Sequence, residues 1–300
     1  MSLQLSSVLD FTSLRSALPY IKRFRDKVFV FKLGGDLCED TKATTNVIEQ
    51  LSLLSLLGIK MILVHGGGKH ATNLGNKLGI ESEFVSGRRV TSKEMLDVAK
   101  MSFAGQLNTD LIAAFRKHDI PAVGLSGIDG RLIKASKRNP KKVFDDAQGK
   151  EREVDYGFVA DIESVDSAIL SHLLSGNYVP VICSLASDDT GQVLNINADT
   201  LASKIAAAIG ATKLCILGTV DGVLLDVKDP QTLLSILNKA EVEKLLKGTT
   251  ISGGMIPKLT TSLDALDHGV PQVHLISGVR TDAILQEIFT NEGSGTMIVP

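Results

Sequence analysis

Six short runs of consecutive apolar residues, rich in Val and Ile, recur along the 300-residue chain, and helical patterns separate nearly all of them. Continuous apolarity, in contrast to strict alternation, indicates a strand that is buried on both faces. Strands of this kind, joined by helical crossovers, form a largely parallel sheet with helices packed on both sides. We therefore predict an α/β fold, a three-layer αβα sandwich around a central, mostly parallel sheet. The runs are Val28–Leu33, Met61–Val64, Ala122–Leu125, Val179–Cys183, Leu214–Leu217 and Val273–Ile276.

Helical spacing of apolar residues is clearest over residues 92–117, where Ser92 is the expected N-cap. The polar stretch from Arg131 to Tyr156 carries mixed charges, which predicts exposed hairpins or a flap over a site. Further helices are predicted over about 41–57, 165–174, 198–209, 255–267 and 282–289.

Composition argues against several kinds of partner. No stretch reaches the roughly 18 apolar residues of a membrane span, so we expect no membrane partner. A formal charge of −2 without a basic cluster predicts no nucleic-acid partner. Cys38, Cys183 and Cys215 are odd in number and widely spaced, which fits neither a disulfide framework nor a zinc site. We therefore expect a cytoplasmic protein that acts on small molecules.

Glycines cluster where the predicted strands end, which is the edge at which open parallel sheets bind ligands. Their backbone amides can face anions, above all at the start of a helix. Three such clusters predict a polyphosphate bound beside a second acidic group. The "GGGKH" segment is not a P-loop, because Leu63 stands where the first glycine belongs and His70 where Ser or Thr belongs. The clusters are Gly34 and Gly35, then Gly66, Gly67 and Gly68, then Gly253 and Gly254.

Seven motifs in a fixed order resemble those of the amino acid kinase family, closest to its acetylglutamate kinase branch. The resemblance runs nearly end to end and implies phosphorylation of the γ-carboxylate of N-acetyl-L-glutamate by MgATP, in arginine biosynthesis. It also implies that Mg²⁺ is held mainly by the ATP phosphates, without a metal site built from protein side chains. The motifs are "FKLGGD", "VHGGGKH", "GRRVTSKEM", "GLSGIDGRLI", "LNINADT", "TVDGVLLD" and "GGMIPKL".

The resemblance implies a catalytic group of Lys32, Lys258 and Asp199. The substrate carboxylate is already ionised at neutral pH, so no general base is needed and the barrier is electrostatic. The two lysines match those that contact the transferring phosphoryl group, and Asp199 matches the carboxylate that orients them. From the residues alone, Asp199 could instead cap the helix that follows it.

Substrate and nucleotide contacts follow from the same resemblance. Arg89 matches the arginine that grips the α-carboxylate, where a planar fork suits bidentate contact, and we expect Arg88 to face solvent. Asn195 and the amides of Gly66 and Gly67 are expected on the acid. The residues expected on ATP are Gly34, Gly35, Thr219, Val220, Gly222, Gly253, Gly254 and Met255.

Three positions depart from the family pattern: Lys69 replaces a proline, Thr219 an acidic or amide residue, and Ser277 an aspartate. These changes leave the lysines intact but put the nucleotide contact of Thr219 in doubt. They could also alter the preference for the acyl group.

The chain is expected to form two lobes, residues 1–185 for the acid and dimerisation and residues 186–300 for ATP, that close by a hinge. Residues 1–26 resemble the N-terminal helix through which arginine-inhibited members form hexamers, with Leu5, Val8, Leu9 and Leu14 at helical spacing and Thr12 and Ser13 as a break. Arginine inhibition of a homodimer or hexamer is therefore an expectation.

Two other functions stay open from the sequence. A sibling kinase would phosphorylate another acid, such as N-succinylglutamate, an N-blocked aminoadipate, aspartate, glutamate or carbamate. A catalytically silent, arginine-sensing or partner-binding module would keep only the fold. Retention of all three catalytic residues argues against the silent module.

Overall fold

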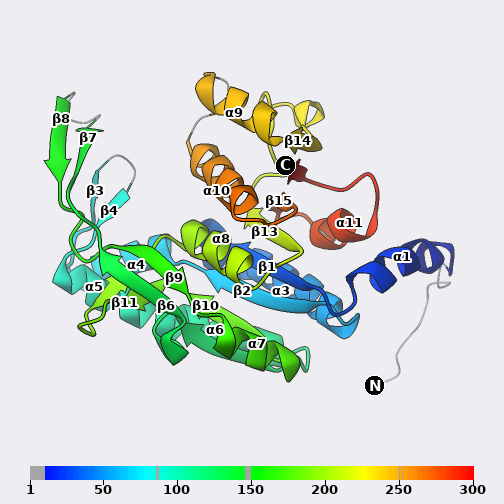
Figure 1. Ribbon diagram of the computed structural model, residues 1–300, viewed down its shortest axis with the longest axis horizontal. Coiled ribbons are helices and arrows are strands. Elements are labelled where there is room, and N and C mark those ends of the chain that lie inside the picture. The colour runs from blue at the N-terminus through cyan, green and yellow to red at the C-terminus, as the bar shows by residue number, and fades with distance from the viewer. Residues whose placement is uncertain (1–10, 86–87, 146–149, 250, 252) are drawn as a thin grey trace.

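An eight-stranded sheet forms the centre of the computed structural model, which describes residues 11–85, 88–145, 150–249, 251 and 253–300 (Figure 1). Every strand pair in it is parallel except β15 with β16. All six predicted strands lie in this sheet, which confirms the predicted fold class. In sheet order the strands are β14 (Ile236–Asn238), β16 (Thr296–Val299), β15 (Val273–Ser277), β13 (Lys213–Gly218), β1 (Val28–Leu33), β2 (Lys60–His65), β10 (Val179–Cys183) and β5 (Ala122–Ser126).

Helices cover both faces of the sheet, and alternate residues of β1 contact opposite layers. Val30 packs with the layer of α8 (Ala198–Ala208) and α10 (Met255–Asp267). Phe29 and Phe31 pack with the layer of α3, α6 and α11 on the other face. Burial on both faces explains why these strands read as continuous apolar runs. The second layer consists mainly of α3 (Thr41–Leu56), α6 (Asn108–Arg116) and α11 (Ala283–Phe289).

Three helix predictions need correction. The run predicted over 92–117 is helical from Lys93 to Arg116 and is capped by Ser92, which accepts from the amide of Met95. It is not one α-helix, because a π-helical segment (Lys100–Leu107) separates α5 (Lys93–Ala99) from α6. The helix predicted from residue 165 begins later, as α7 (Ala168–Ser175), because strand β9 (Ala160–Val165) extends to that residue. Asp282 is the N-cap of α11, with left-handed backbone, and is not its first helical residue.

The N-terminal prediction is partly outside the described residues, since Leu5, Val8 and Leu9 precede residue 11. Helix α1 (Phe11–Phe24) contains Thr12 and Ser13, so the predicted break at these two residues is wrong. Among the described residues no helix is both long and apolar enough to cross a membrane. The remaining helices are α2 (Gly35–Glu39), α4 (Gly68–Lys77) and α9 (Lys239–Lys247), with short 3₁₀ turns at Asp129–Arg131 and Pro230–Thr232.

A smaller four-stranded sheet and two hairpins lie beside the central sheet (Figure 1). The prediction of hairpins within 131–156 is confirmed by β7 and β8, whereas the four-stranded sheet was not predicted. Arg152 of β8 lies 3.9 Å from Glu83 of β3, so the two hairpins are neighbours. The small sheet has the order β12 (Val193–Asn195), β11 (Leu185–Ser187), β6 (Ile133–Lys137) and β9 (Ala160–Val165), and the hairpins are β3 (Glu83–Val85) with β4 (Arg88–Val90) and β7 (Lys141–Asp145) with β8 (Lys150–Val154).

Candidate active site

The glycine clusters lie at the carboxyl edge of the central sheet. Because β1, β2 and β13 are parallel and in register, their last residues end at the same edge. Helix α2 begins at Gly35 directly after β1, and α4 begins at Gly68 after β2. A side chain on Gly67 would place its Cβ 2.5 Å from Leu107 Cδ1 and 2.6 Å from Phe103 Cδ1, so any larger residue would have to displace these two buried side chains of the π-helical segment.

Lys32 and Asp199 form an ion pair at this edge. The Lys32 Nζ lies 2.8 Å from Asp199 Oδ1, and only 7% of Lys32 is exposed. The contact lacks hydrogen-bond geometry, and Asp199 Oδ1 has no hydrogen-bond partner among the described residues. Asn197 caps α8 by accepting from the amide of Thr200 at 2.9 Å, so the alternative role of Asp199 as the N-cap is excluded. The Asp199 carboxylate is therefore directed at Lys32.

Lys258 reaches the same point from α10. A Cβ added to Gly218, the last residue of β13, would lie 2.5 Å from Lys258 Nζ, so the ammonium group rests on the end of that strand. Burial lowers the pKa of Lys258, and the charge of Lys32 lowers it further, while Asp199 and Asp36 oppose the shift. The two lysines thus share one electrostatic environment, although they come from opposite halves of the chain.

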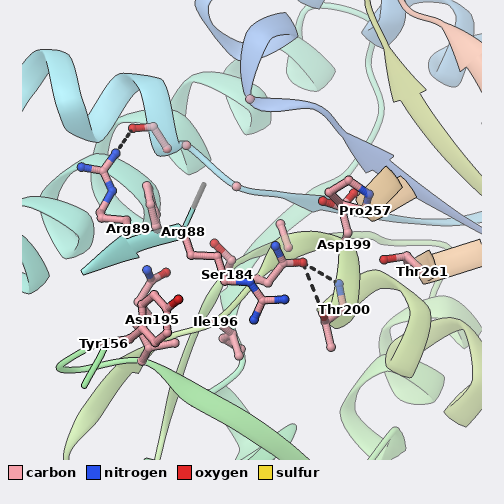
Figure 2. Close-up of a pocket in the computed structure, with 18 of the residues that line it drawn as sticks. Arg88, Arg89, Tyr156, Ser184, Asn195, Ile196, Asp199, Thr200, Pro257 and Thr261 are labelled. Carbon is pink, nitrogen blue, oxygen red and sulfur yellow. Dashed lines mark hydrogen bonds between the residues drawn. The ribbon is translucent and has the colours of Figure 1, made fainter. Parts of the chain in front are cut away.

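A cavity of about 920 Å³ opens beside the ion pair (Figure 2). It lies between the central sheet and the hairpins, and its walls include residues from α4, β4, α8 and α10. The sequence-predicted residues in its described lining are Lys32, Gly35, Gly66, Gly67, Arg89, Asn195 and Asp199. Those outside that lining are Gly34, Thr219, Val220, Gly222, Gly253, Gly254, Met255 and Lys258. The residues predicted to contact the acid are therefore gathered in one cavity, whereas Gly35 is the one residue predicted to contact ATP that belongs to its described lining.

Arg89 makes four side-chain hydrogen bonds in the cavity wall. Its Nη2 donates to Gly68 O and Thr72 Oγ1, both at 2.6 Å, as Figure 2 shows in part. Its Nη1 contacts Ser82 and the sulfur of Met95. Burial lowers the pKa of Arg89, but a guanidinium stays charged at neutral pH. A carboxylate that binds the terminal nitrogens would exchange with one of these bonds.

Asn195 and Arg88 also face the cavity. Asn195 Nδ2 lies 3.3 Å from Thr91 Oγ1, which leaves its side-chain oxygen as an acceptor. Arg88 is exposed, as predicted, and it also lines the cavity. Both residues are labelled in Figure 2.

The two strand-end departures from the family pattern differ in burial. Thr219 is exposed just after β13, so its hydroxyl is accessible. Ser277 is buried at the end of β15 and accepts from the amide of Arg280 at 3.3 Å. Ser277 therefore has a local structural partner. Gly222 is also buried, and the amide of the following Val223 donates to Thr296 Oγ1.

Several lining residues were not predicted. Arg138 and Asp161 form a two-point contact at the hairpin side, from Nε at 2.9 Å and from Nη2 at 2.5 Å. Burial acts to raise the pKa of Asp161, but the bonds and charge of Arg138 outweigh it and hold the pKa below its usual value. Arg138 belongs to the polar stretch predicted as a flap, so mixed charge was the available signal. Tyr156 ends the same stretch, whereas Ser184 and Thr261 line the cavity without any such signal.

His65, the last residue of β2, contacts the glycine turn that follows it. Its Nδ1 lies 2.8 Å from Gly66 O, and its Nε2 lies 3.1 Å from Asn108 Nδ2. The amide can only donate, so Nε2 accepts and Nδ1 carries the proton. Complete burial lowers the pKa of His65 to about 4, which keeps the imidazole neutral. His65 therefore fixes the turn and is not placed to exchange protons with a ligand.

The fold is a three-layer sandwich, and the carboxyl edge of its central sheet brings together two lysines, a carboxylate and glycine amides. Such an arrangement is typical of an enzyme that acts on anionic groups. Residues 27–277 match the model of the amino acid kinase family. The chain belongs to the amino acid kinase family, as the resemblance of its motifs implied.

Two similar proteins indicate the branch of the family to which the chain is related. The chain is 46% identical to the acetylglutamate kinase of Myxococcus xanthus, across 96% of this chain and 94% of that protein. It is 42% identical to the acetylglutamate kinase of Methanothermobacter thermautotrophicus, across 94% and 96%. Identity at this level over nearly the full length groups the chain with the acetylglutamate kinases, which confirms the predicted branch.

Solved structures agree on the fold. N-acetylglutamate synthase from Neisseria gonorrhoeae, complexed with coenzyme A and N-acetyl-glutamate, superposes with a TM-score of 0.82 at 26% identity. The match covers 98% of this chain and 64% of the longer synthase chain. Carbamate kinase from Giardia lamblia, at 17% identity and a TM-score of 0.61, shares the fold alone.

Proposed function

We propose that this kinase transfers the γ-phosphoryl group of ATP to the γ-carboxylate of N-acetyl-L-glutamate, a step of arginine biosynthesis. The observation that carries the proposal is the convergence of Lys32, Asp199 and Lys258 beside the cavity that contains Arg89. The acetylglutamate kinases that share 42–46% identity support the choice of acid.

The reaction needs positive charge more than proton transfer. A γ-carboxyl group with a pKa of about 4.3 is ionised at neutral pH, so one of its oxygens can attack phosphorus directly. A new bond forms between that oxygen and Pγ while the bond from Pγ to the bridging oxygen breaks, and its electron pair leaves with ADP. No proton moves. Lys32 and Lys258 then offset the repulsion between the acid and the nucleotide and stabilise charge on the equatorial oxygens.

Asp199 has a positioning role in this proposal. Its carboxylate holds the Lys32 ammonium at 2.8 Å, so the donor is oriented before the substrates arrive. Preorganisation of this kind removes the reorganisation that flexible lysines would otherwise need in the transition state.

The acid is proposed to lie along the cavity wall between the glycine turn and the small sheet. Arg89 binds the α-carboxylate, and Asn195 bonds the N-acetyl amide or the carboxylate. The amides of Gly66 and Gly67 donate to the γ-carboxylate and direct it to the lysines. Enclosure of all four groups by one cavity supports this placement.

The nucleotide is proposed to approach from the side of β13 and α10. The described residues include no cluster of three or more His, Cys, Asp or Glu side chains that could ligate a metal ion. Mg²⁺ is proposed to be carried mainly by the ATP phosphates, where it would supply further positive charge. We propose residues 1–185 as the acid-binding lobe and 186–300 as the nucleotide-binding lobe. The residues proposed on ATP are Gly34, Gly35, Thr219, Val220, Gly222, Gly253, Gly254 and Met255.

A coupled ADP-release assay tests the proposal. N-acetyl-L-glutamate should support turnover, while aspartate, glutamate and carbamate should give at least tenfold lower kcat/KM because they lack the N-acyl α-amino acid pattern, a factor of ten being about 1.4 kcal/mol. Faster turnover of N-succinylglutamate or an N-blocked aminoadipate would identify a sibling kinase instead. No ADP with any acid would support the silent module.

Arginine is proposed as a feedback inhibitor of a hexamer. Helix α1 lies against α11, and the Tyr20 hydroxyl contacts the Asn291 side chain at their junction. Binding at this junction would couple the N-terminal helix to the C-terminal lobe. A sizing column that shows only dimers, together with activity that is indifferent to millimolar arginine, contradicts this regulation.

The cytoplasm is the proposed compartment. All three cysteines are free. Cys183 is buried at the end of β10, and Cys215 is buried within β13. Burial raises the pKa of both thiols to about 12, so neither is a reactive thiolate. Unpaired thiols are the normal state of a protein in a reducing compartment.

A further inference from the structure

An ion pair between Lys69 and Asp36 joins two of the glycine turns. Lys69 is the second residue of α4, and Asp36 is the second residue of α2. The turns themselves are adjacent, because a Cβ on Gly35 would lie 3.9 Å from the amide nitrogen of Gly68. The pair therefore lies where the sites proposed for the acid and for the nucleotide meet.

The pair is exposed and exchangeable. The side chains of Lys69 and Asp36 are 67% and 51% exposed. Exposed ion pairs contribute little to stability, since water screens them and the side chains lose entropy. A ligand oxygen that carries more negative charge can take the place of Asp36 on a flexible ammonium group. A contribution to folding stability therefore does not explain why Lys69 and Asp36 lie at this position.

Lys69 also lines the cavity, although its helix presents it to solvent. Asp36 is close enough to Lys258 to act on that residue electrostatically, so the pair belongs to the same charge network as Lys32 and Asp199. Cations outnumber carboxylates in the described lining, where Asp161 and Asp199 each already contact a cation. The cations are Lys32, Lys69, Arg88, Arg89, Arg138 and Lys141.

We propose that Lys69 is a third phosphoryl-binding cation, which leaves Asp36 when nucleotide binds and contacts the terminal phosphate. The proposal rests on the proposed function for its reaction, in which Lys69 stays protonated and exchanges no proton. Asp36 keeps the ammonium group at the cavity edge until the phosphate arrives.

Discrimination between nucleotides tests the role directly. Binding of AMP-PNP, a non-hydrolysable ATP analogue, and of ADP is measured by calorimetry with Mg²⁺ for the whole chain and for Lys69→Met and Lys69→Gln. Loss of one hydrogen bond to a charged group should weaken AMP-PNP about tenfold in both variants and leave ADP within about twofold. Lys69→Arg should restore AMP-PNP binding to within about threefold, because it keeps the charge.

Lys77→Met is the matched control, because Lys77 is exposed on the same helix and lies outside the described cavity lining. It should change neither affinity. Asp36→Asn should bind AMP-PNP at least as tightly as the unmodified chain, since Asp36 competes for the ammonium group.

Equal AMP-PNP affinity in Lys69→Met and Lys77→Met overturns the inference. Parallel weakening of AMP-PNP and ADP overturns it too, because a terminal-phosphate contact affects only the triphosphate. These measurements are independent of the acid: a chain that binds AMP-PNP but releases no ADP with N-acetyl-L-glutamate would refute the proposed function and still decide the role of Lys69.

Discussion

Replacement of Lys258 by alanine tests whether the charge of this residue serves catalysis or the stability of the fold. Its ammonium group rests on Gly218 and is partly desolvated beside Lys32. Both burial and the charge of Lys32 lower the pKa of Lys258, so folding disfavours its charged form. Removal of the charge relieves that penalty, and Lys258→Ala should unfold at a temperature no lower than the unmodified chain, apart from lost packing of its methylene groups.

Activity should respond in the opposite way. Loss of one preorganised donor to a developing phosphoryl charge typically lowers kcat about 10²–10³-fold, roughly 2.7–4 kcal/mol. Because the partner cation Lys32 remains beside Asp199, we expect a reduction in kcat of at least about tenfold, with a smaller change in the KM for the acid. Lys258→Arg should retain part of the activity.

The assay is ADP release at saturating ATP and acid, with thermal unfolding of each variant measured in parallel. Lys247→Ala is the control, because Lys247 is exposed on the neighbouring helix α9. Unchanged kcat in Lys258→Ala would remove this residue from the mechanism. A loss of activity that tracks a lower unfolding temperature would show a structural role instead.

Three further predictions address the substrate contact, the glycine turn and its histidine. Arg89→Lys should raise the KM for N-acetyl-L-glutamate about tenfold with a smaller change in kcat, because lysine lacks the bidentate fork, and steady-state kinetics check this. Gly67→Ala should lower the unfolding free energy by about 1–3 kcal/mol in denaturant titration, since its Cβ would overlap Leu107 and Phe103. For His65, a pKa of about 4 against an ordinary 6.5 means that the unfolded chain binds the extra proton, so stability should fall by about 3 kcal/mol as pH drops from 6.5 to 4. His65→Gln should flatten that part of the stability profile, and an unchanged slope would contradict the assignment.

Local signals were enough for the elements that are buried on both faces or clearly capped. The strand at Val28–Leu33 and the helix at Met255–Asp267 were predicted with the bounds that the structure has. Continuous apolarity and helical spacing are properties of neighbouring residues, so no distant contact is needed to recognise them. Ser92 was identified as a cap for the same reason, since its partner is only three residues away.

Short and edge strands gave no comparable signal. Strand β14 has three residues and β16 has four, and both are recognisable only from their pairing with each other and with β15. The π-helical segment is similar, because apolar spacing along Lys100–Leu107 reads as an ordinary helix. Its geometry accompanies the close packing of Phe103 and Leu107 on Gly67, a contact between distant parts of the chain.

Sequence alone determined the residue types of the site: lysines, an aspartate, an arginine and glycines at strand ends, which together indicate a reaction between anions. Only the tertiary structure decided how they meet. Parallel register brings the ends of β1, β2 and β13 to one edge, and this places Lys32 against Asp199 and Lys258 over Gly218. The pairing of Lys69 with Asp36 and of Arg138 with Asp161 was equally invisible, because electrostatic interactions depend on distance in space, which local sequence patterns do not encode.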